Sequence, residues 1–484
     1  MNSVDKRVGQ RRFGIVGGVG ALAGADVLFK LVQRAARQGE AQPDVLLEQQ
    51  PLSEGDAVAR GEADPRESKF YVFNIVRHFE SQGVDRVLLP SFICHTFLDD
   101  IQAETALPIV NLMTAVTDHL ERELPAGTPL GVLTCDYVRR AGLLESHLGA
   151  RHPLHYPSAD AQAGLMEAIY GPRGLKAGYL DDAALDAVMQ ACRSLQADGV
   201  GVILAASTEV ALLAERLAAR GIRLIDSNRV YADHALERDA VPAGEPVKVG
   251  IVGGVGPAAT VDFMDKLVRL TRAQRDQEHV RLLVEHNPQI PDRTAHILGR
   301  GPDPSIALYA ACKRLEAGGA AMIAIPCNTA HAYLGDLQPH LSIPVISMPD
   351  VTMARIAERY PHCPPVGLLA TSGTMSSGVY RRAAERAGLT LIVPDDAHQA
   401  QVMNAIYGDK GVKAGFVDGE CRADLLAAAR HLADRGAEVL ILGCTELPLI
   451  VPGEDALNLG GREVGLVDPT RELARRCVEL AQGA

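Results

Sequence analysis

Two cysteines stand where a thiol could act as an acid or a base. Cys327 lies in IAIPCNTAH, where an apolar run ends at a proline and a polar segment follows. Cys444 lies in VLILGCTELPLI, which has the same layout. If each polar segment opens a helix, the helix dipole lowers the pKa of the thiol, although either cysteine could instead be a small core residue. The pattern predicts two thiol acid/bases that face one cleft.

Hydrogen-bonding side chains accompany the two cysteines. Asn328 and Thr329 follow the first cysteine and Thr445 follows the second, so each motif offers polar groups to a bound anion. Thr371 and Thr374 in ATSGT come after another apolar run. There they either bind a ligand or cap a helix.

Other residues near the cysteines have less specific patterns. We expect His331 and Glu446 to give structural support to the neighbouring cysteine. The loop GGVGPAAT at 253–260 weakly matches a dinucleotide fingerprint, but Gly256 need only form a turn or let backbone N–H groups bind a substrate carboxylate. Five further cysteines lack a partner motif and are expected to be inert: Cys192, Cys312, Cys363, Cys421 and Cys477.

The segments that must position these residues alternate between short apolar strands and amphipathic helices. In the second half of the chain the candidate strands are KVGIVGG, VRLLVEHN, AMIAIP, IPVISM, VGLLAT, LTLIVP and VLILG. Continuous apolar strands separated by helices are typical of parallel sheets covered on both faces, and ligands of such sheets bind beyond the carboxyl ends of the strands. We therefore predict an α/β fold with both cysteines at such ends.

The sequence contains a long internal repeat. GIVGGVG at 14–20 recurs at 250–256, and MEAIYGPRGLKAG from Met166 recurs as MNAIYGDKGVKAG from Met403. Repetition in the same order over this length indicates a tandem duplication. We predict a first domain at 1–238, a charged linker containing Pro and Gly at 239–246, and a second domain at 247–484.

Composition excludes several classes of partner. The net charge of −12 over 484 residues argues against nucleic acid and anionic membranes as partners. The polar N-terminus is not followed by an apolar signal core, and no run of about 18 apolar residues occurs, so we expect a cytoplasmic protein. The nine cysteines are scattered and form no CxxC pair, which predicts free thiols rather than disulfides or a zinc site.

The second copy resembles the aspartate/glutamate racemase family of cofactor-independent amino-acid racemases. The resemblance rests on six segments in the family's order: GGVGP, NPQIPDRT, IPCNTAH, LLATSGT, IYGDKGVKAG and LGCTELPLI. It implies that each domain has two open parallel-sheet α/β lobes with the active site between them, and that no cofactor or metal takes part. It also implies that Cys327 and Cys444 remove and return the α-proton on opposite faces of the substrate, a task that suits a thiol whose pKa lies near neutrality.

The same resemblance implies a dicarboxylic substrate, aspartate or alternatively glutamate. Arg293 and Lys413 match positions associated with the side-chain carboxylate, and a guanidinium can bind a carboxylate with two hydrogen bonds. A maleate isomerase-like two-cysteine enzyme and a non-catalytic amino-acid-binding or regulatory protein are the alternatives. The expected substrate-binding residues are Gly256, Arg293, Asn328, Thr329, Thr371, Thr374, Lys413 and Thr445.

The first copy lacks the residues that this chemistry needs. Ser91 and Ser207 stand at the positions of the two cysteines, Phe92 replaces the asparagine, and Asp56 replaces the arginine. A serine hydroxyl is too weakly acidic to replace a thiolate without an activating base. Cys94, about one helical turn after Ser91, could still face the cleft and support one-sided proton transfer. We expect instead a non-catalytic domain, with or without a ligand, that packs on the second copy as an internal pseudo-dimer; further homo-oligomers are left open.

Overall fold

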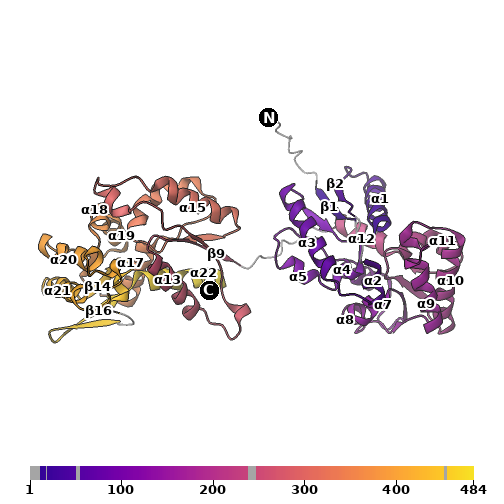
Figure 1. The fold of residues 1–484 in the computed structure, drawn as a ribbon. Helices are drawn as coiled ribbons and strands as arrows, with labels where there is room; N and C mark the ends of the chain where they lie inside the picture. Colours follow the sequence, from indigo (N-terminus) through magenta and orange to yellow (C-terminus); the bar gives the residue numbers. More distant parts are fainter. Residues whose placement is uncertain are drawn as a thin grey trace. The chain divides into compact units, whose positions relative to one another are not determined.

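The computed structural model describes residues 11–17, 19–50, 55–237, 247–362, 364–451 and 455–483. The chain divides into two compact units, Met1–Glu245 and Pro246–Ala484 (Figure 1). The expected linker at 239–246 lies outside the described residues. Within the described ranges, no helix combines the length and the apolar character that crossing a membrane requires.

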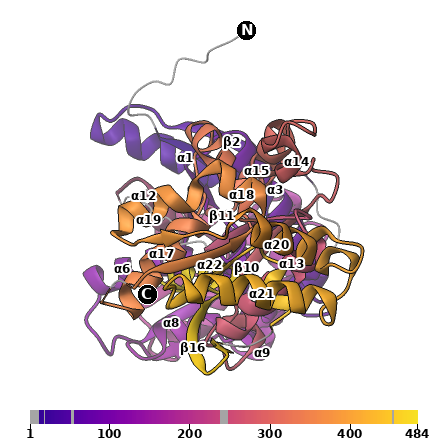
Figure 2. The same ribbon diagram turned by 90° about the vertical axis from the view of Figure 1, so that its left-hand side faces the viewer.

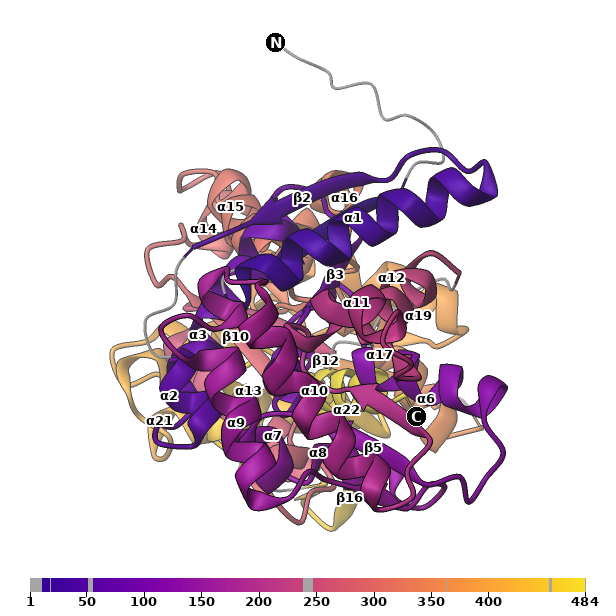
Figure 3. The ribbon, with the colours of Figure 1, turned by 90° about the vertical axis from the view of Figure 1, so that its right-hand side faces the viewer.

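The first unit contains two four-stranded parallel sheets, in the orders β2-β1-β3-β4 and β6-β5-β7-β8. Figure 3 shows α9 and α10 side by side over the second of these sheets, and the two helices are in contact. The strands are β1 (Arg12–Val16), β2 (Asp44–Glu48), β3 (Arg86–Leu88), β4 (Ile109–Val110), β5 (Leu130–Leu133), β6 (Leu154–His155), β7 (Val202–Ala205) and β8 (Leu224–Ile225). The helices are α1 (Ala21–Gln38), α2 (Gly55–Arg60), α3 (Arg66–Ser81), α4 (Phe92–His95), α5 (Leu98–Gln102), α6 (Leu112–Glu123), α7 (Asp136–Arg140), α8 (Leu143–Leu148), α9 (Ala159–Tyr170), α10 (Asp182–Ala197), α11 (Ala214–Ala218) and α12 (Ser227–Glu237), with 3-10 helices η1 (Leu175–Ala177) and η2 (Val210–Leu213).

The second unit repeats this plan with a three-stranded sheet, β10-β9-β11, and a five-stranded sheet, β13-β12-β14-β16-β15. All pairings are parallel except that of β15 with β16. The strands are β9 (Lys248–Gly253), β10 (Arg281–His286), β11 (Met322–Ala324), β12 (Val366–Ala370), β13 (Leu391–Ile392), β14 (Val439–Gly443), β15 (Ala456–Leu459) and β16 (Arg462–Val467). The helices are α13 (Pro257–Leu270), α14 (Arg293–Ile297), α15 (Ser305–Ala317), α16 (Leu334–Leu337), α17 (Met348–Arg359), α18 (Ser372–Ser377), α19 (Val379–Ala387), α20 (Asp396–Tyr407), α21 (Glu420–Asp434) and α22 (Pro469–Gln482), with 3-10 helices η3 (Asp276–Glu278), η4 (Thr329–Tyr333), η5 (Gln338–His340), η6 (Val412–Ala414) and η7 (Leu447–Leu449).

The predicted α/β fold with two parallel-sheet lobes per copy is confirmed. We call the lobe around β9 the first lobe of the second unit and the lobe around β12 its second lobe. Every residue of β12 and β14 is buried, as expected for apolar strands covered on both faces. The chain crosses between the lobes twice, because α22 follows the second lobe but packs against α13 and α17 (Figure 2).

Two local expectations differ from the structure. IPVISM forms no strand, and Val345 pairs with Ile323 only in an isolated bridge. The hairpin of β15 and β16 was not expected, because its residues lack a continuous apolar run. Gly460 and Gly461 connect the two strands with φ of 69° and 92°, and positive φ at both positions is what a tight two-residue hairpin turn demands.

Candidate active site

The two cysteines of the second unit line one cavity between its lobes. Cys327 follows β11 and Cys444 directly follows β14, so each lobe contributes one thiol. The cavity has a volume of about 20 Å³, which suits a water molecule rather than an amino acid. An amino acid would fit between the two thiols only if the lobes separated. The lining residues are Val255, Asp292, Arg293, Thr294, Cys327, Asn328, Thr329, Thr371, Tyr407, Lys413, Cys444, Thr445 and Glu446.

The cysteine segments do not open α-helices as expected. Cys327 precedes the short 3-10 helix η4, and Cys444 precedes η7, which has three residues. The three-residue η7 is too short to carry much of the aligned dipole that lowers a thiol pKa, whereas η4 continues directly into α16 and η5. The expected lowering of the Cys444 pKa is wrong, because burial raises that pKa well above its ordinary value and the Glu446 carboxylate raises it further.

His331 holds the Cys327 segment in place. Its Nδ1 lies 2.9 Å from the carbonyl oxygen of Cys327, and its Nε2 accepts a hydrogen bond from the backbone N–H of Met348 at 3.0 Å. Since Nε2 accepts, Nδ1 carries the proton and donates to Cys327, which is the neutral tautomer. Burial lowers the pKa of His331 and favours this form. His331 thus acts on the backbone beside the thiol.

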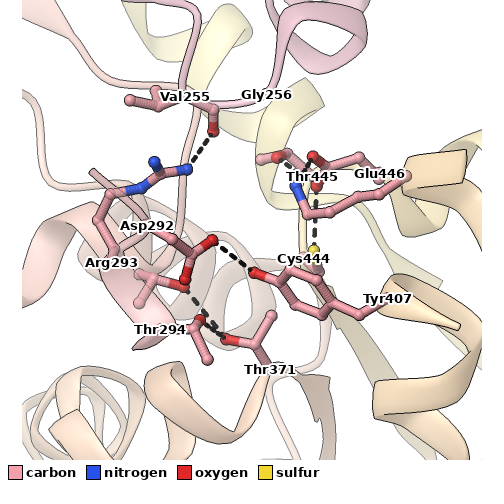
Figure 4. Close-up of polar contacts among 12 residues, drawn as sticks. Val255, Gly256, Asp292, Arg293, Thr294, Thr371, Tyr407, Cys444, Thr445 and Glu446 are labelled. Atoms are coloured by element: carbon pink, nitrogen blue, oxygen red, sulfur yellow. Dashed lines mark hydrogen bonds and ion pairs between the residues drawn. The ribbon is translucent and has the colours of Figure 1, made fainter. Parts of the chain in front are cut away.

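Arg293 is a buried cation beside Cys327. Its guanidinium donates to the carbonyl oxygens of Val255 at 3.0 Å and Pro291 at 3.1 Å, and only 8% of the residue is exposed (Figure 4). Burial would lower the pKa of Arg293, but the charge and hydrogen bond of Cys327 outweigh this effect and raise it. Its Nε has no partner among the described residues. The guanidinium is therefore placed to stabilise negative charge on Cys327 Sγ and still has an N–H to offer.

Cys444, Glu446 and Lys413 form a hydrogen-bonded chain in the second lobe (Figure 4). Cys444 Sγ donates to Glu446 Oε2 at 3.0 Å, and Lys413 Nζ donates to Glu446 Oε1 at 2.5 Å. Burial would raise the pKa of Glu446, but the Lys413 ammonium outweighs it and holds that pKa below its ordinary value. At neutral pH this arrangement keeps Glu446 ionised and Cys444 protonated.

Gly256 makes room for the Glu446 carboxylate. Its φ is 126°, which L side chains rarely adopt, and a Cβ there would lie 2.5 Å from Glu446 Oε1. Gly256 itself is absent from the cavity lining. The structure therefore gives this glycine a packing role between the loop after β9 and the second lobe.

Four threonine hydroxyls connect the lobes next to the cavity. Thr329 and Thr294 of the first lobe contact Thr371 of the second at 3.2 and 3.1 Å, and Thr329 also contacts Thr374 at 2.8 Å. Thr371 caps α18, since its Oγ1 accepts from the backbone N–H of Thr374 at 3.1 Å. Thr371 thus caps a helix and lines the cavity, whereas Thr374 lies outside the lining.

Two further groups complete the wall. Asn328 is 2% exposed, its Oδ1 accepts from Tyr380 at 2.5 Å, and its Nδ2 has no partner among the described residues. A buried amide N–H₂ without a partner is costly and suits a ligand carboxylate. Tyr407 donates to Asp292 Oδ2 at 3.1 Å (Figure 4), and the Lys413 ammonium lies over its ring, 5.4 Å from the centroid.

Sequence reasoning missed several lining residues. Three of them lie in the segments PDRT and IYGDKGVKAG, in which sequence reasoning had marked only the basic residues Arg293 and Lys413. These three are Asp292, Thr294 and Tyr407. Glu446 had been expected to give structural support rather than to tune the thiol. Their adjacency to the marked residues was the available signal. The contacts of Thr294 with Thr371, of Tyr407 with Asp292 and of Glu446 with Lys413 depend on packing between distant segments.

A family model described as Asp/Glu/hydantoin racemase matches residues 16–235 and again residues 252–477. The chain belongs to this racemase family. The two matches confirm the tandem duplication. No individual relative is needed for this assignment, because the matched regions together span most of the chain.

Individual relatives of this racemase chain match about one copy. This chain is 25% identical over 237 residues to the broad specificity amino-acid racemase RacX of Bacillus subtilis (strain 168). The match covers 48% of this chain and 96% of that protein. The chain is 30% identical over 187 residues to the glutamate racemase of Roseiflexus sp. (strain RS-1), covering 38% of this chain and 65% of that protein. A solved Picrophilus torridus aspartate racemase has 28% sequence identity and a TM-score of 0.41, and the match covers 49% of this chain and 94% of that one.

The first unit of this racemase keeps the scaffold of the cavity with other side chains. Ser207 Oγ donates to Glu209 Oε2 at 3.0 Å, as Cys444 does to Glu446. Lys176 pairs with Asp56 at 2.8 Å, so the residue that replaces Arg293 neutralises this lysine. The cavity is again about 20 Å³ in volume and is lined by Val19, Ser91, Phe92, Ile93, Cys135, Val138, Tyr170, Lys176, Ala206, Ser207, Thr208 and Glu209.

The thiol in the first-unit cavity is Cys135 rather than Cys94. Cys94 is absent from the lining, and burial raises its pKa to about 12 although Ser91 opposes this effect. Cys94 sits on α4, whose buried face turns it into the core. Cys135 follows β5 and is the N-cap residue of α7, in the place that Thr371 takes before α18 in the second unit, and burial raises its pKa to about 11. Cys135 is the one cysteine among the residues that line this cavity, so no second thiol lies opposite it.

The contact between Glu446 and Cys444 predicts the effect of Glu446→Gln. The change removes the negative charge that raises the Cys444 pKa and frees Lys413, so this pKa should fall. Iodoacetamide labelling of Cys444 across a pH series, read by mass spectrometry of its peptide, measures the midpoint. Glu438→Gln is the control, because Glu438 is a surface carboxylate paired only with His362 among the described contacts. An unchanged labelling midpoint in Glu446→Gln would contradict the electrostatic role of Glu446.

Proposed function

We propose that the second unit racemises an acidic amino acid, aspartate or alternatively glutamate, by proton transfer between Cys327 and Cys444 without a cofactor. The observation that carries the proposal is one cavity with a thiol from each lobe and different charges beside them. Arg293 adjoins Cys327, whereas Glu446 adjoins Cys444. This asymmetry gives the resting enzyme one base and one acid.

The proton transfers follow from these surroundings. Cys327 as thiolate takes the α-proton, and the electron pair of the broken Cα–H bond is delocalised into the substrate's α-carboxylate. Cys444 gives its thiol proton to the opposite face of Cα and becomes the thiolate, whose charge Lys413 offsets. Cys327 is then the thiol. The reverse reaction, or proton exchange with water, restores the starting state.

Substrate charge is matched by groups on both sides of the cavity. Arg293 Nε and Asn328 Nδ2 are buried donors without partners among the described residues, and both suit a carboxylate. Lys413 is held by Glu446 at the second lobe and adds a positive charge. Because the cavity is small, we propose that the lobes open to admit the substrate and close to exclude water.

The first unit we propose to be non-catalytic. Ser91 and Ser207 cannot supply the thiolate and the thiol. Asp56 forms an ion pair with Lys176, the lysine that would otherwise contact an acidic substrate. The first unit thus provides an internal comparison in which the scaffold is kept and the chemistry is lost.

Incubation with L-aspartate in heavy water tests the proposed activity. D-aspartate should accumulate with deuterium at Cα, because the incoming proton comes from a thiol that has exchanged with solvent. Chiral chromatography with mass spectrometry measures both quantities. L-glutamate, a panel of neutral amino acids and maleate define the substrate class. Absence of D-product and of α-deuterium with both acidic amino acids would overturn the proposal, and conversion of maleate would favour the isomerase alternative.

A further inference from the structure

We propose that the second unit binds a zinc ion through Asp395, His398 and His431, at a site separate from the cysteine cavity. One ligand atom from each residue lies within 4.8 Å of the others, and this is the one such group of three among the described residues. None of the three lines the cysteine cavity. Two imidazoles and one carboxylate are a ligand set that zinc accepts, with water in the remaining position.

The site lies where α20 begins and α21 ends. Asp395 is the N-cap residue of α20, and His398 stands in the first turn of that helix. His431 belongs to the last turn of α21, which packs against α20 (Figure 2). The zinc ion would therefore bind two neighbouring helices together at one end.

The carboxylate of Asp395 already bridges the two imidazoles. Its Oδ1 lies 2.6 Å from His398 Nδ1, and its Oδ2 lies 3.6 Å from His431 Nε2. His431 Nε2 also accepts a weak hydrogen bond from the Asp395 backbone N–H at 3.4 Å. The lone pair of Nε2 therefore points toward Asp395. Zinc needs each ligand atom at about 2.0–2.2 Å. The three ligand atoms lie within 4.8 Å of one another, so the side chains would have to rotate to bring them to that distance from one centre.

The imidazole rings stack face to face, with centroids 3.8 Å apart and an angle of 13° between their planes. Bringing both nitrogens onto one ion requires the rings to tilt toward each other. The side chains have the freedom to do so, since those of Asp395 and His398 are 52% and 31% exposed. The same exposure gives the ion a path from solvent.

The first unit shows that the helix pair does not need these side chains for packing. The equivalent positions are Ser158, Ala161 and Ser194, and α9 packs against α10 without any of the three ligands. Ser158 N–H donates to Ser194 Oγ at 3.1 Å, which reproduces the backbone contact of Asp395 with His431. Ser194 therefore satisfies the ordinary helix contact, whereas Ser158 makes no side-chain capping hydrogen bond. The two histidines and the aspartate add metal-binding chemistry to one copy of a shared scaffold.

Zinc titration of the tag-free full-length protein tests the site. After removal of metal by a chelator, competition with a chromophoric zinc indicator should show one tight equivalent. The measurement is repeated on the double variant Cys327→Ser, Cys444→Ser, so that zinc bound by the cavity thiols is not counted. In that background, His398→Ala and His431→Ala should each weaken binding by more than about tenfold.

Two further variants make the test specific. His362→Ala removes an exposed histidine that also faces a carboxylate, Glu438, and should bind zinc as the parent does. Asp395→Asn preserves helix capping, so the zinc-free protein should unfold at the same temperature while its zinc affinity falls. Zinc should raise the unfolding midpoint of the parent but not of His431→Ala. The proposal would be overturned if the parent bound no zinc, or if His398→Ala and His431→Ala bound zinc as tightly as the parent does. The three residues would then form only a hydrogen-bonded imidazole–carboxylate cluster.

Discussion

Replacing either Cys327 or Cys444 by serine is expected to reduce racemisation by roughly a thousandfold or more, because a hydroxyl is a far weaker acid and its alkoxide is not formed at neutral pH. Each variant removes one of the two proton-transfer groups, and racemisation needs both. The rate of D-aspartate formation from L-aspartate measures the effect. The fold should survive, because the first unit carries serine at both positions: Ser207 keeps the contact with its glutamate, and the Ser91 carbonyl keeps the contact with its histidine.

Exchange of the α-proton separates the roles of the two thiols. A variant that retains the base for one enantiomer can still exchange the α-proton of that enantiomer with solvent, while its racemisation is lost. Ser91→Ala and Ser207→Ala are the matched controls in the first unit and should racemise aspartate at the parent rate. Racemisation near the parent rate in Cys327→Ser or Cys444→Ser would contradict the two-thiol mechanism, and loss of activity in Ser91→Ala would show that the first unit takes part.

Arg293→Ala is expected to lower kcat/KM for the acidic substrate by roughly a hundredfold or more, because it removes a buried charge-assisted contact to the carboxylate and the cation beside Cys327. Steady-state kinetics with L-aspartate measure the effect.

Arg293→Lys tests geometry apart from charge. Lysine keeps the positive charge but lacks the planar fork, so kcat/KM should recover only in part. Arg314→Ala, which removes an exposed arginine paired with Glu285, is the control and should leave kcat/KM unchanged. If Arg293→Ala keeps the parent kcat/KM, Arg293 has only the structural role of binding the carbonyl oxygens of Val255 and Pro291.

Local patterns were enough to predict most strands of the second unit. KVGIVGG, VGLLAT and VLILG correspond to β9, β12 and β14, since a continuous apolar run between helices is a property of the segment itself. The strand predicted at IPVISM was wrong, because the segment leads into α17 and makes only the isolated bridge between Val345 and Ile323. The β15–β16 hairpin depends on cross-strand pairing, which an apolar run does not reveal.

The helix-dipole argument for the thiols failed for a tertiary reason. The residues after Cys444 do turn helically, but only for the three residues of η7. The larger effects on the Cys444 pKa are burial and the carboxylate of Glu446. Burial of a thiol is decided by the surrounding lobe and not by the residues next to it.

By itself, the sequence determined that the chain is a duplication, that both cysteines follow buried strands, and that only the second copy keeps them. These features are local or repetitive, so they can be read without knowing which distant segments meet. The tertiary structure decided the environment of each thiol: Arg293 beside Cys327, and Lys413 bound to the Glu446 that accepts the Cys444 proton. It also decided that Asp395 and His398 meet His431. Contacts of this kind join segments far apart in the chain, and only the packing of helices and sheets brings them within hydrogen-bond distance.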